Sequence, residues 1–189
     1  MSARLFAAVD LPVDVRAQLA AFGQACATAD PALRAVGEDA LHVTLAFLGH
    51  RPVSDVDAAV DAVRSAVPGS ARPVPLELGE PLWLSPRRPQ VLTVELADVD
   101  GALARLQHEV EDRLASALDW PPERRAFRPH VTVARVRSRA KPRRRGLAPA
   151  PRAAFAARAL TLYRSHLGGG PARYEALARV PLGMSDRAG

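Results

Sequence analysis

Along this chain, short apolar segments alternate with longer segments in which apolar residues recur at helical spacing. In the first longer segment Val15, Leu19 and Phe22 share one helix face, and Pro12 suits the first turn of that helix. The short segments are rich in β-formers and are bounded by turn residues, as strands are. We therefore predict helices over residues 12–28, 54–67 and 98–118, and strands over residues 4–9, 41–48, 74–78, 90–96, 130–136, 159–164 and 174–180.

The order of these elements predicts an α+β fold with antiparallel sheets. Strands and helices are interspersed, but turns such as residues 167–171 are short enough to join hairpins. No glycine-rich phosphate loop follows a strand, which disfavours a parallel nucleotide-binding sheet. Residues 138–151 are rich in arginine and proline and predict a loop, and the tail 184–189 is expected to fray.

The composition is that of a globular protein. The chain has 189 residues, of which 48% are hydrophobic and 24% are charged; this excludes a disordered tail protein and suffices for one domain or two small lobes. No apolar run reaches the roughly 18 residues of a membrane span, and the first residues lack the apolar stretch of a signal peptide. The single cysteine, Cys26, excludes a disulfide framework and a cysteine-rich metal site, so we expect a cytoplasmic protein.

The formal net charge of +6 suggests a polyanionic partner. A second explanation stays open, because only one of the 26 basic residues is a lysine, Lys141, and a GC-rich genome alone favours arginine and alanine. Composition explains the clustering of the charge less well, since eight basic residues and no acidic one lie between Arg128 and Arg145. The loop 137–145 would either steer phosphates toward a binding site or stay solvated.

One hexapeptide occurs twice, 88 residues apart. Residues 42–47 read His-Val-Thr-Leu-Ala-Phe and residues 130–135 read His-Val-Thr-Val-Ala-Arg, so four of six positions are identical. Side chains alternate along a strand, so the histidine and the threonine of each copy share one face, and the aliphatic residues share the other. If the two halves are related by pseudo-twofold symmetry, both histidine–threonine faces converge on one cleft.

Two imidazoles with ordinary pKa values of about 6.5 can supply a base and an acid at neutral pH. Threonine hydroxyls can donate to the non-bridging oxygens of a phosphoryl group, and the sequence suggests neither a Ser-His-Asp site nor enough clustered ligands for a catalytic metal. The pattern suits in-line displacement at phosphorus. Arg135 would stabilise charge on the phosphate, but its odd offset from Thr132 aims it at the opposite face unless a bulge or a strand end redirects it.

These residues resemble the two-histidine phosphoesterase superfamily, and within it the bacterial RNA 2′,3′-cyclic phosphodiesterase family, also called 2′-5′ RNA ligase. The similarity covers nearly the whole chain and is carried by residues 4–12, 41–49, 127–135 and parts of 162–182. The resemblance implies a single bilobed domain over residues 1–189. Its two pseudo-symmetric lobes, each an antiparallel sheet with helices on its outer face, would surround a central cleft. It implies no metal and no cofactor.

The reaction that the resemblance implies is the metal-independent hydrolysis of RNA or nucleoside 2′,3′-cyclic phosphates to 2′-phosphates, with 2′-5′ ligation of RNA as the reverse chemistry. By position, His42 and His130 are the catalytic pair, Thr44 and Thr132 bind the phosphate, and Arg135 contacts the phosphate or the nucleotide. We expect His130 to be the base toward water and His42 the acid toward the departing 3′ oxygen, although the near-symmetry of the motifs does not fix that order. The expected partner is an RNA end with a cyclic phosphate, or a cyclic nucleotide, bound by a monomer without an obligate protein partner.

The chain departs from the family pattern before the first motif. Where family members usually have an aromatic residue, this chain has Ala35-Val36, so a stacking or wall contact is missing. Phe47 could take part of that role, but its odd offset from His42 predicts a core position.

Other polar and aromatic candidates are assigned to solvent or to packing. His166 is expected to be solvated or structural, and Tyr163 and Tyr174 are expected to pack. Two further functions stay open beside the first: a related enzyme that acts on another small cyclic phosphate, or a non-catalytic protein that binds RNA ends.

Overall fold

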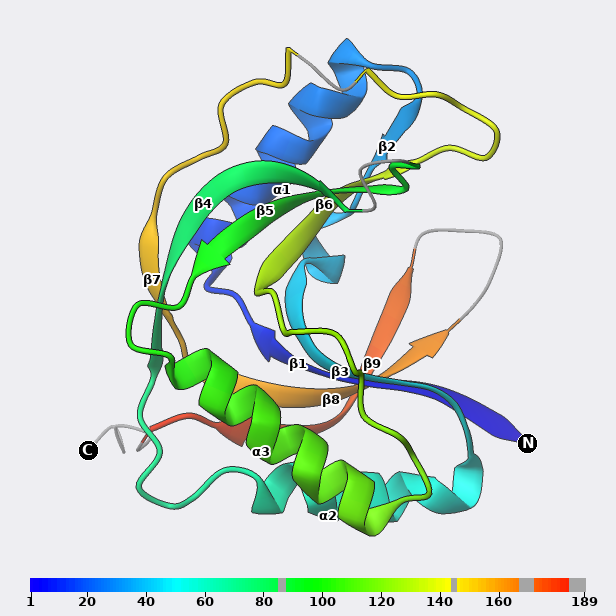
Figure 1. Ribbon diagram of the computed structural model, residues 1–189, viewed down its shortest axis with the longest axis vertical. Helices are drawn as coiled ribbons and strands as arrows, with labels where there is room; N and C mark the ends of the chain where they lie inside the picture. The colour runs from blue at the N-terminus through cyan, green and yellow to red at the C-terminus, as the bar shows by residue number, and fades with distance from the viewer. Residues whose placement is uncertain (85–87, 144–145, 167–171, 184–189) are drawn as a thin grey trace.

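The computed structural model describes residues 1–84, 88–143, 146–166 and 172–183 (Figure 1). The α-helices are α1 (Val13–Ala29), α2 (Val56–Ser65) and α3 (Ala102–Ala117), and two 3-10 helices span Glu38–Ala40 and Val53–Asp55. The strands are β1 (Ser2–Asp10), β2 (Leu33–Ala35), β3 (His42–Pro52), β4 (Val74–Leu84), β5 (Val91–Ala97), β6 (His130–Val136), β7 (Ala154–Ala157), β8 (Ala159–His166) and β9 (Arg173–Pro181). The predicted turn 167–171 and tail 184–189 lie outside the described residues.

Every predicted helix and strand is found, and two short strands were missed. β2 has three residues around a polar Arg34, and β7 is mainly alanine, so neither shows the β-forming composition that marks the others. Strand β3 does not end at Gly49, contrary to the prediction. Gly49 adopts a φ of 69°, a left-handed conformation that glycine tolerates, and the strand continues to Pro52.

All strands belong to one antiparallel sheet, and the predicted α+β class is confirmed. The strand order is β7-β4-β5-β6-β3-β1-β8-β9, and β2 also pairs with β6. β7 and β8 lie near opposite ends of this order but are separated in the chain only by Arg158. The sheet therefore curls until its two ends approach each other (Figure 1). One half contains β4–β7 and the other contains β1, β3, β8 and β9, and they join where β3 meets β6.

The two halves exchange helices. β1 and β3 are neighbours in one half, but α1, which connects them, packs against β2 and β6 of the other half. β5 and β6 are neighbours in that other half, but α3, which lies between them in sequence, packs against β3 and α2. Figure 1 shows α1 beside the upper half and α2 and α3 beneath the lower half. The helix that connects two strands of one half therefore packs on the core of the other half, for α1 and for α3 alike.

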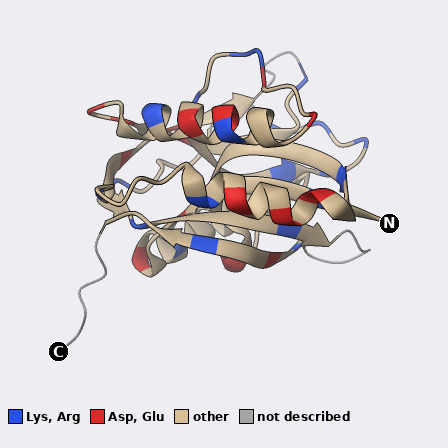
Figure 2. Cartoon of the chain, turned by 90° about the horizontal axis from the view of Figure 1, so that it is seen from below, with Lys and Arg blue, Asp and Glu red and all other residues tan. Residues whose placement is uncertain are grey.

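The core consists of aliphatic side chains from the sheet and the helices. Val9, Val43, Val131 and Leu162 are fully buried, and each contributes about 1.5–3 kcal/mol relative to an exposed side chain. The solvent-facing sides of α2 and α3 carry both positive and negative side chains (Figure 2). Within the described parts of the chain, no helix is long and apolar enough to cross a membrane.

Candidate active site

The two histidine-containing strands meet at the residue that follows each histidine. Val43 of β3 and Val131 of β6 are antiparallel partners. When that pairing is extended by one residue on either side, His42 lies opposite Thr132, and the threonine of the first copy lies opposite His130. The histidines are then diagonal neighbours on one face, which ordinary sheet geometry sets at about 7–8 Å between Cα atoms. Both histidines and both threonines line one cavity of about 650 Å³.

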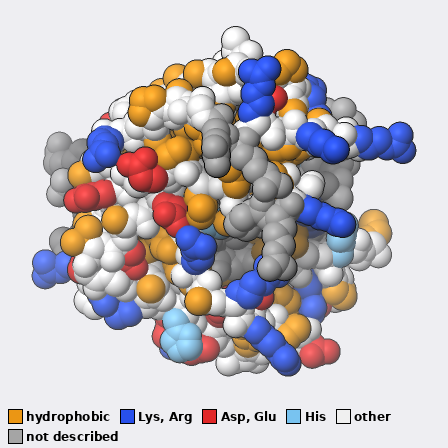
Figure 3. Space-filling model, turned by 45° about the horizontal axis from the view of Figure 1, so that its top comes forward, with side chains coloured by type: hydrophobic (Ala, Val, Ile, Leu, Met, Phe, Trp, Pro, Cys, Tyr) orange, Lys and Arg blue, Asp and Glu red, His pale blue; other side chains and the backbone are white. Residues whose placement is uncertain are grey.

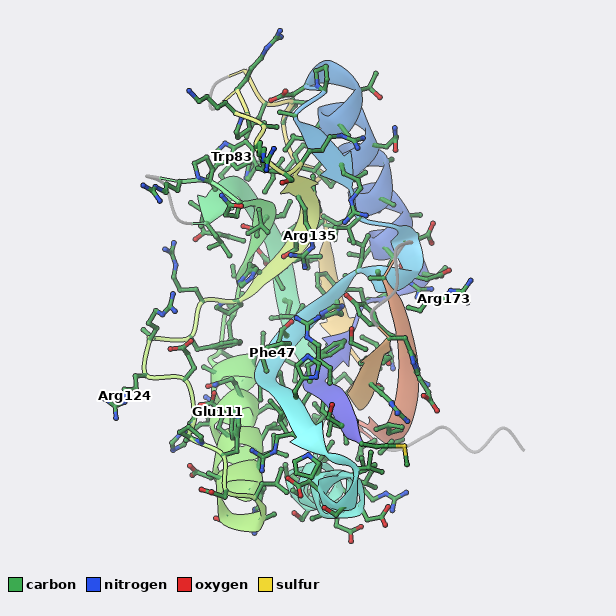
Figure 4. All side chains as sticks on the ribbon, turned by 90° about the vertical axis from the view of Figure 1, so that its right-hand side faces the viewer. Phe47, Trp83, Glu111, Arg124, Arg135 and Arg173 are labelled. Atoms are coloured by element: carbon green, nitrogen blue, oxygen red, sulfur yellow. The ribbon has the colours of Figure 1, made fainter. Side chains whose placement is uncertain are left out.

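Each of these strands has a β-bulge directly after its threonine. The register of β3 with β1 skips Leu45, and the register of β6 with β5 skips Val133. An extra residue reverses the alternation of the side chains beyond it, so Phe47 and Arg135 return to the face that carries the histidines. Figure 4 looks onto this side of the molecule and shows Arg135 above Phe47. Arg135 lines the cavity. Without the bulge at Val133, regular alternation would turn its side chain to the opposite face of the sheet.

Phe47 is not part of the core, and that prediction was wrong. Its residue surface is 52% exposed, and the guanidinium of Arg4 lies 4.9 Å from the centre of its ring. The prediction assumed unbroken alternation from His42, which the bulge at Leu45 interrupts. The ring lies on the cleft side of β3, outside the residues that line the cavity.

Both histidines are held by the same backbone contact. Nδ1 of His42 lies 2.9 Å from the carbonyl oxygen of Ala40, and Nδ1 of His130 lies 2.7 Å from that of Arg128. A carbonyl oxygen only accepts hydrogen bonds, so each Nδ1 carries a hydrogen and donates it. The contact fixes the tautomer and the ring orientation, and it leaves Nε2 as the nitrogen that can exchange a proton with a ligand.

His42 is surrounded by aromatic rings. The ring centre of Phe6 lies 4.8 Å from that of His42, and Tyr174 meets His42 edge-on at 5.3 Å. Burial lowers the pKa of His42 to about 4; Arg135 acts in the same direction, while the contact with Ala40 and the charge of Asp10 oppose it. His42 is therefore neutral at pH 7 when the cavity holds no anion.

Asp10 forms the polar support behind His42 and was missed by the sequence analysis. It is the cross-strand partner of His42. One carboxylate oxygen accepts from the Tyr163 hydroxyl at 2.7 Å, and the other accepts from Thr161 Oγ1 at 3.0 Å and from Arg179 Nε at 2.9 Å. Burial, and then this bond to Asp10, raise the pKa of Tyr163 to about 12, so its hydroxyl remains a donor. The sequence did not indicate Asp10, because its contacts depend on the pairing of β1 with β3 and β8.

A second arginine shares the cavity with Arg135. Arg34 of β2 lies directly opposite Arg135 of β6, and both line the cavity. The sequence carries no signal for Arg34, because its strand is short and its partner is distant in the chain. Glu38 and Asp39 also line the cavity. Among the described residues, no three His, Cys, Asp or Glu side chains are grouped so that they could hold a metal ion.

The cavity is also lined by one aromatic ring and by small side chains. Tyr174 packs against Phe6 and His42, as predicted, and it also lines the cavity. Ala35 and Val36, which stand where the family pattern has an aromatic residue, line it as well. No aromatic side chain therefore lines the cavity at that position.

The remaining candidates lie away from this cavity. His166 is exposed and its Nε2 lies 2.9 Å from Glu175, in agreement with a solvated position. The loop 137–143 runs beside β2, because Arg137 donates to the carbonyl oxygen of Leu33 and the backbone N–H of Arg143 donates to Asp30. Residues 144 and 145 of the predicted basic loop lie outside the described part. Basic side chains gather on the right-hand side of the face in Figure 3.

Comparisons with known proteins agree with this geometry. A family model described as the 2′-5′ RNA ligase superfamily matches residues 11–169. The chain is 35% identical over 106 residues to an Aeropyrum pernix protein named RNA 2′,3′-cyclic phosphodiesterase, a match that covers 56% of this chain and 58% of that protein. The chain thus spans less than two thirds of that relative. A protein of the same name from Escherichia coli strain K12 is 30% identical over 191 residues, covering 95% of this chain and 96% of that one.

The fold is that of a solved structure as well. The crystal structure of Escherichia coli LigT complexed with 3′-AMP has a TM-score of 0.80 to this chain at 26% identity. The superposition covers 97% of this chain and 100% of that one. The curled sheet therefore belongs to a fold that both proteins share.

Proposed function

The chain belongs to the 2′-5′ RNA ligase superfamily, and on that premise we propose that it hydrolyses the 2′,3′-cyclic phosphate of an RNA end or a nucleoside to a 2′-phosphate. The relatives described above carry the name RNA 2′,3′-cyclic phosphodiesterase. One observation supports the transfer of that activity more than any other. Two histidines with identically fixed tautomers share one cavity with two threonines and Arg135.

In the proposed reaction, Nε2 of His130 takes a proton from water as the water oxygen attacks phosphorus. The bond between phosphorus and the 3′ oxygen breaks, and Nε2 of His42 gives its proton to that oxygen. Thr44 and Thr132 donate to the non-bridging oxygens, and the Arg135 guanidinium stabilises the charge that accumulates there. The ribose keeps the phosphate on its 2′ oxygen.

The role of His42 as acid requires that it gain a proton when substrate binds. Its aromatic surroundings favour the neutral ring in the free protein. An anionic cyclic phosphate beside Nε2 favours the charged ring, and Asp10, the cross-strand partner of His42, acts in the same direction. Substrate binding is therefore coupled to proton uptake. In the 2′-5′ ligation of RNA, which is the reverse chemistry, the two histidines exchange roles.

A second candidate activity rests on the small side chains of Ala35 and Val36, which line the cavity where an aromatic residue is expected. A cavity without an aromatic side chain at that position accepts other small cyclic phosphates with little penalty for the missing base. A panel of 2′,3′-cyclic mononucleotides, cyclic-ended RNA and ADP-ribose cyclic phosphate separates the two activities by their relative kcat/KM. A protein that only binds RNA ends turns over none of them.

We propose that the active unit is a monomer with a single bilobed domain.

Hydrolysis of adenosine 2′,3′-cyclic phosphate in the presence of EDTA tests the proposal. We expect 2′-AMP as the product, and we expect His42→Ala and His130→Ala each to abolish turnover. His108→Ala is a matched control, because His108 is exposed on α3 and contacts only Asp112 among the ion pairs of the described residues. Full activity of either active-site variant, or 3′-AMP as the product, contradicts the mechanism.

A further inference from the structure

A second cavity adjoins the catalytic one. It has a volume of about 490 Å³ and shares His42, Asp39 and Tyr174 with the first cavity as walls. The two cavities are therefore direct neighbours. The volume lies within the range of small-molecule sites.

The second cavity is lined by more basic than acidic side chains. Arg16, Arg158 and Arg179 line it, together with Asp10 and Asp39. Arg179 is paired with Asp10 at 2.9 Å, so these two charges largely cancel. Asp39 and Arg158 are both exposed, so solvent screens the charge of each. Three arginines against two carboxylates leave the wall with a small positive balance, to which the half-buried Arg16 contributes most.

Neither of these two arginines is engaged by a carboxylate within the described residues. Nε of Arg16 is buried and has no hydrogen-bond partner there, a condition that is uncommon for a buried donor. Arg158 stands at the bend between β7 and β8, where its own carbonyl oxygen accepts from Leu182 N–H. Both arginines line the cavity and neither is neutralised by a carboxylate, so their charges remain to balance a bound anion.

The start of α1 adds to the positive potential of this wall. Pro12 and Val13 line the cavity, and the first amide groups of α1 have no side-chain cap. Uncapped N-terminal amides of a 17-residue helix carry a partial positive charge. Helix start and arginines therefore favour the same sign of ligand charge.

We propose that this second cavity is a subsite for a phosphodiester of the RNA strand, one nucleotide away from the cyclic phosphate, with Arg16 and Arg158 as its cationic groups. The inference rests on the proposed function, because it takes the cyclic phosphate to lie at His42. It identifies the substrate as an RNA end of at least two nucleotides. A mononucleotide cyclic phosphate fills only the first cavity and forgoes this contact.

The test compares three substrates, of which the two dinucleotides differ only in one charge. They are adenosine 2′,3′-cyclic phosphate, the dinucleotide ApA with a terminal 2′,3′-cyclic phosphate, and the same dinucleotide with a neutral methylphosphonate between its nucleosides. We expect kcat/KM for the charged dinucleotide to exceed that for the neutral one on the order of tenfold, as for one charge-assisted contact. In Arg16→Gln and Arg158→Gln the ratio falls toward one. Arg113→Gln, on the exposed face of α3 and paired with Glu109, keeps the wild-type ratio.

Equal kcat/KM for the two dinucleotides overturns the subsite, and so does a ratio that both arginine variants preserve. A ratio lost only in Arg34→Gln overturns it as well, because the phosphodiester then lies in the first cavity. Thermal unfolding of each variant identifies losses that come from misfolding. Binding separates the subsite from the proposed function. If no substrate is hydrolysed but 5′-labelled ApA 3′-phosphate binds more tightly than its methylphosphonate form, and Arg16→Gln and Arg158→Gln each abolish that preference, the function fails and the subsite stands.

Discussion

Replacing Gly23 by alanine perturbs the active site from the opposite side of the sheet. Gly23 lies on α1 where the helix crosses the bulge of β6, and a Cβ at this position would lie 2.5 Å from the carbonyl oxygen of Val133. It would also lie 3.3 Å from the carbonyl carbon. Contacts of this kind need about 3.4 Å or more, so helix and strand must separate by nearly 1 Å. The clashing atoms belong to the backbone, which cannot rotate away.

The cost follows from what the shift disturbs. Overpacking a well-packed site costs about 1–3 kcal/mol. The Val133 carbonyl oxygen accepts from Val36 N–H at 2.9 Å, and weakening that bond costs about 1 kcal/mol. Alanine recovers about 1 kcal/mol through its better helix propensity. We therefore expect the free energy of unfolding to fall by about 1–3 kcal/mol.

Activity is expected to fall further than stability explains. Val133 is the bulge residue that turns Arg135 toward the cavity, and a displacement of about 1 Å in an active site costs up to about a hundredfold in rate. The assay is kcat/KM for a cyclic-ended dinucleotide well below the melting temperature. Gly69→Ala is the control, since a Cβ on Gly69 meets nothing within 4 Å.

A double-mutant cycle shows whether the effect passes through Arg135. In an Arg135→Ala background, Gly23→Ala should lose most of its effect on kcat/KM but keep its effect on unfolding. Wild-type stability and wild-type kcat/KM for Gly23→Ala would refute the reasoning. Additive effects of the two substitutions on kcat/KM would show that the bulge does not act through Arg135.

Three further predictions follow from burial, charge and topology. The pKa of His42 is about 4 when folded and about 6.5 when unfolded; the unfolded chain therefore binds the extra proton, and stability falls as the pH drops from about 6.5 to 4, by about 3 kcal/mol in total. Urea unfolding at several pH values measures this, and His42→Gln should flatten the profile in that window. Phe47→Ala should cost less than about 1 kcal/mol, because the ring is exposed, whereas a core phenylalanine costs about 3–5 kcal/mol; chemical denaturation distinguishes the two. The exchange of α1 and α3 between the halves predicts one cooperative unfolding transition by calorimetry, and two separated transitions would contradict it.

The sequence predicts the α-helices and the longer strands, and it fails where the backbone departs from regular geometry. Periodicity locates the three α-helices and the longer strands of the described residues, because those segments bury one face against a core. The repeated hexapeptide correctly places each histidine on the same face as its threonine, because the bulge in each strand begins only after the threonine. The bulges at Leu45 and Val133 carry no residue signal, so alternation counted across them misplaced Phe47. Arg34 and Asp10 depend on which strands are neighbours, and pairing between distant segments cannot be read from either segment alone.

The two bulges also explain how a duplicated frame acquires an asymmetric site. Each lies at the same place in its repeat, and each is covered by the helix contributed by the other half. α1 places Gly23 against the bulge of β6, and α3 places Gln107 against that of β3, where its side-chain amide reaches the Leu45 carbonyl oxygen at 3.4 Å. The same backbone device thus directs the sixth residue of each repeat to the cleft side. In one half that residue is Arg135, which lines the cavity, and in the other it is Phe47, which does not. Identical histidines therefore meet different neighbours, and in the proposed mechanism this difference, together with the rings around His42, distinguishes the acid from the base.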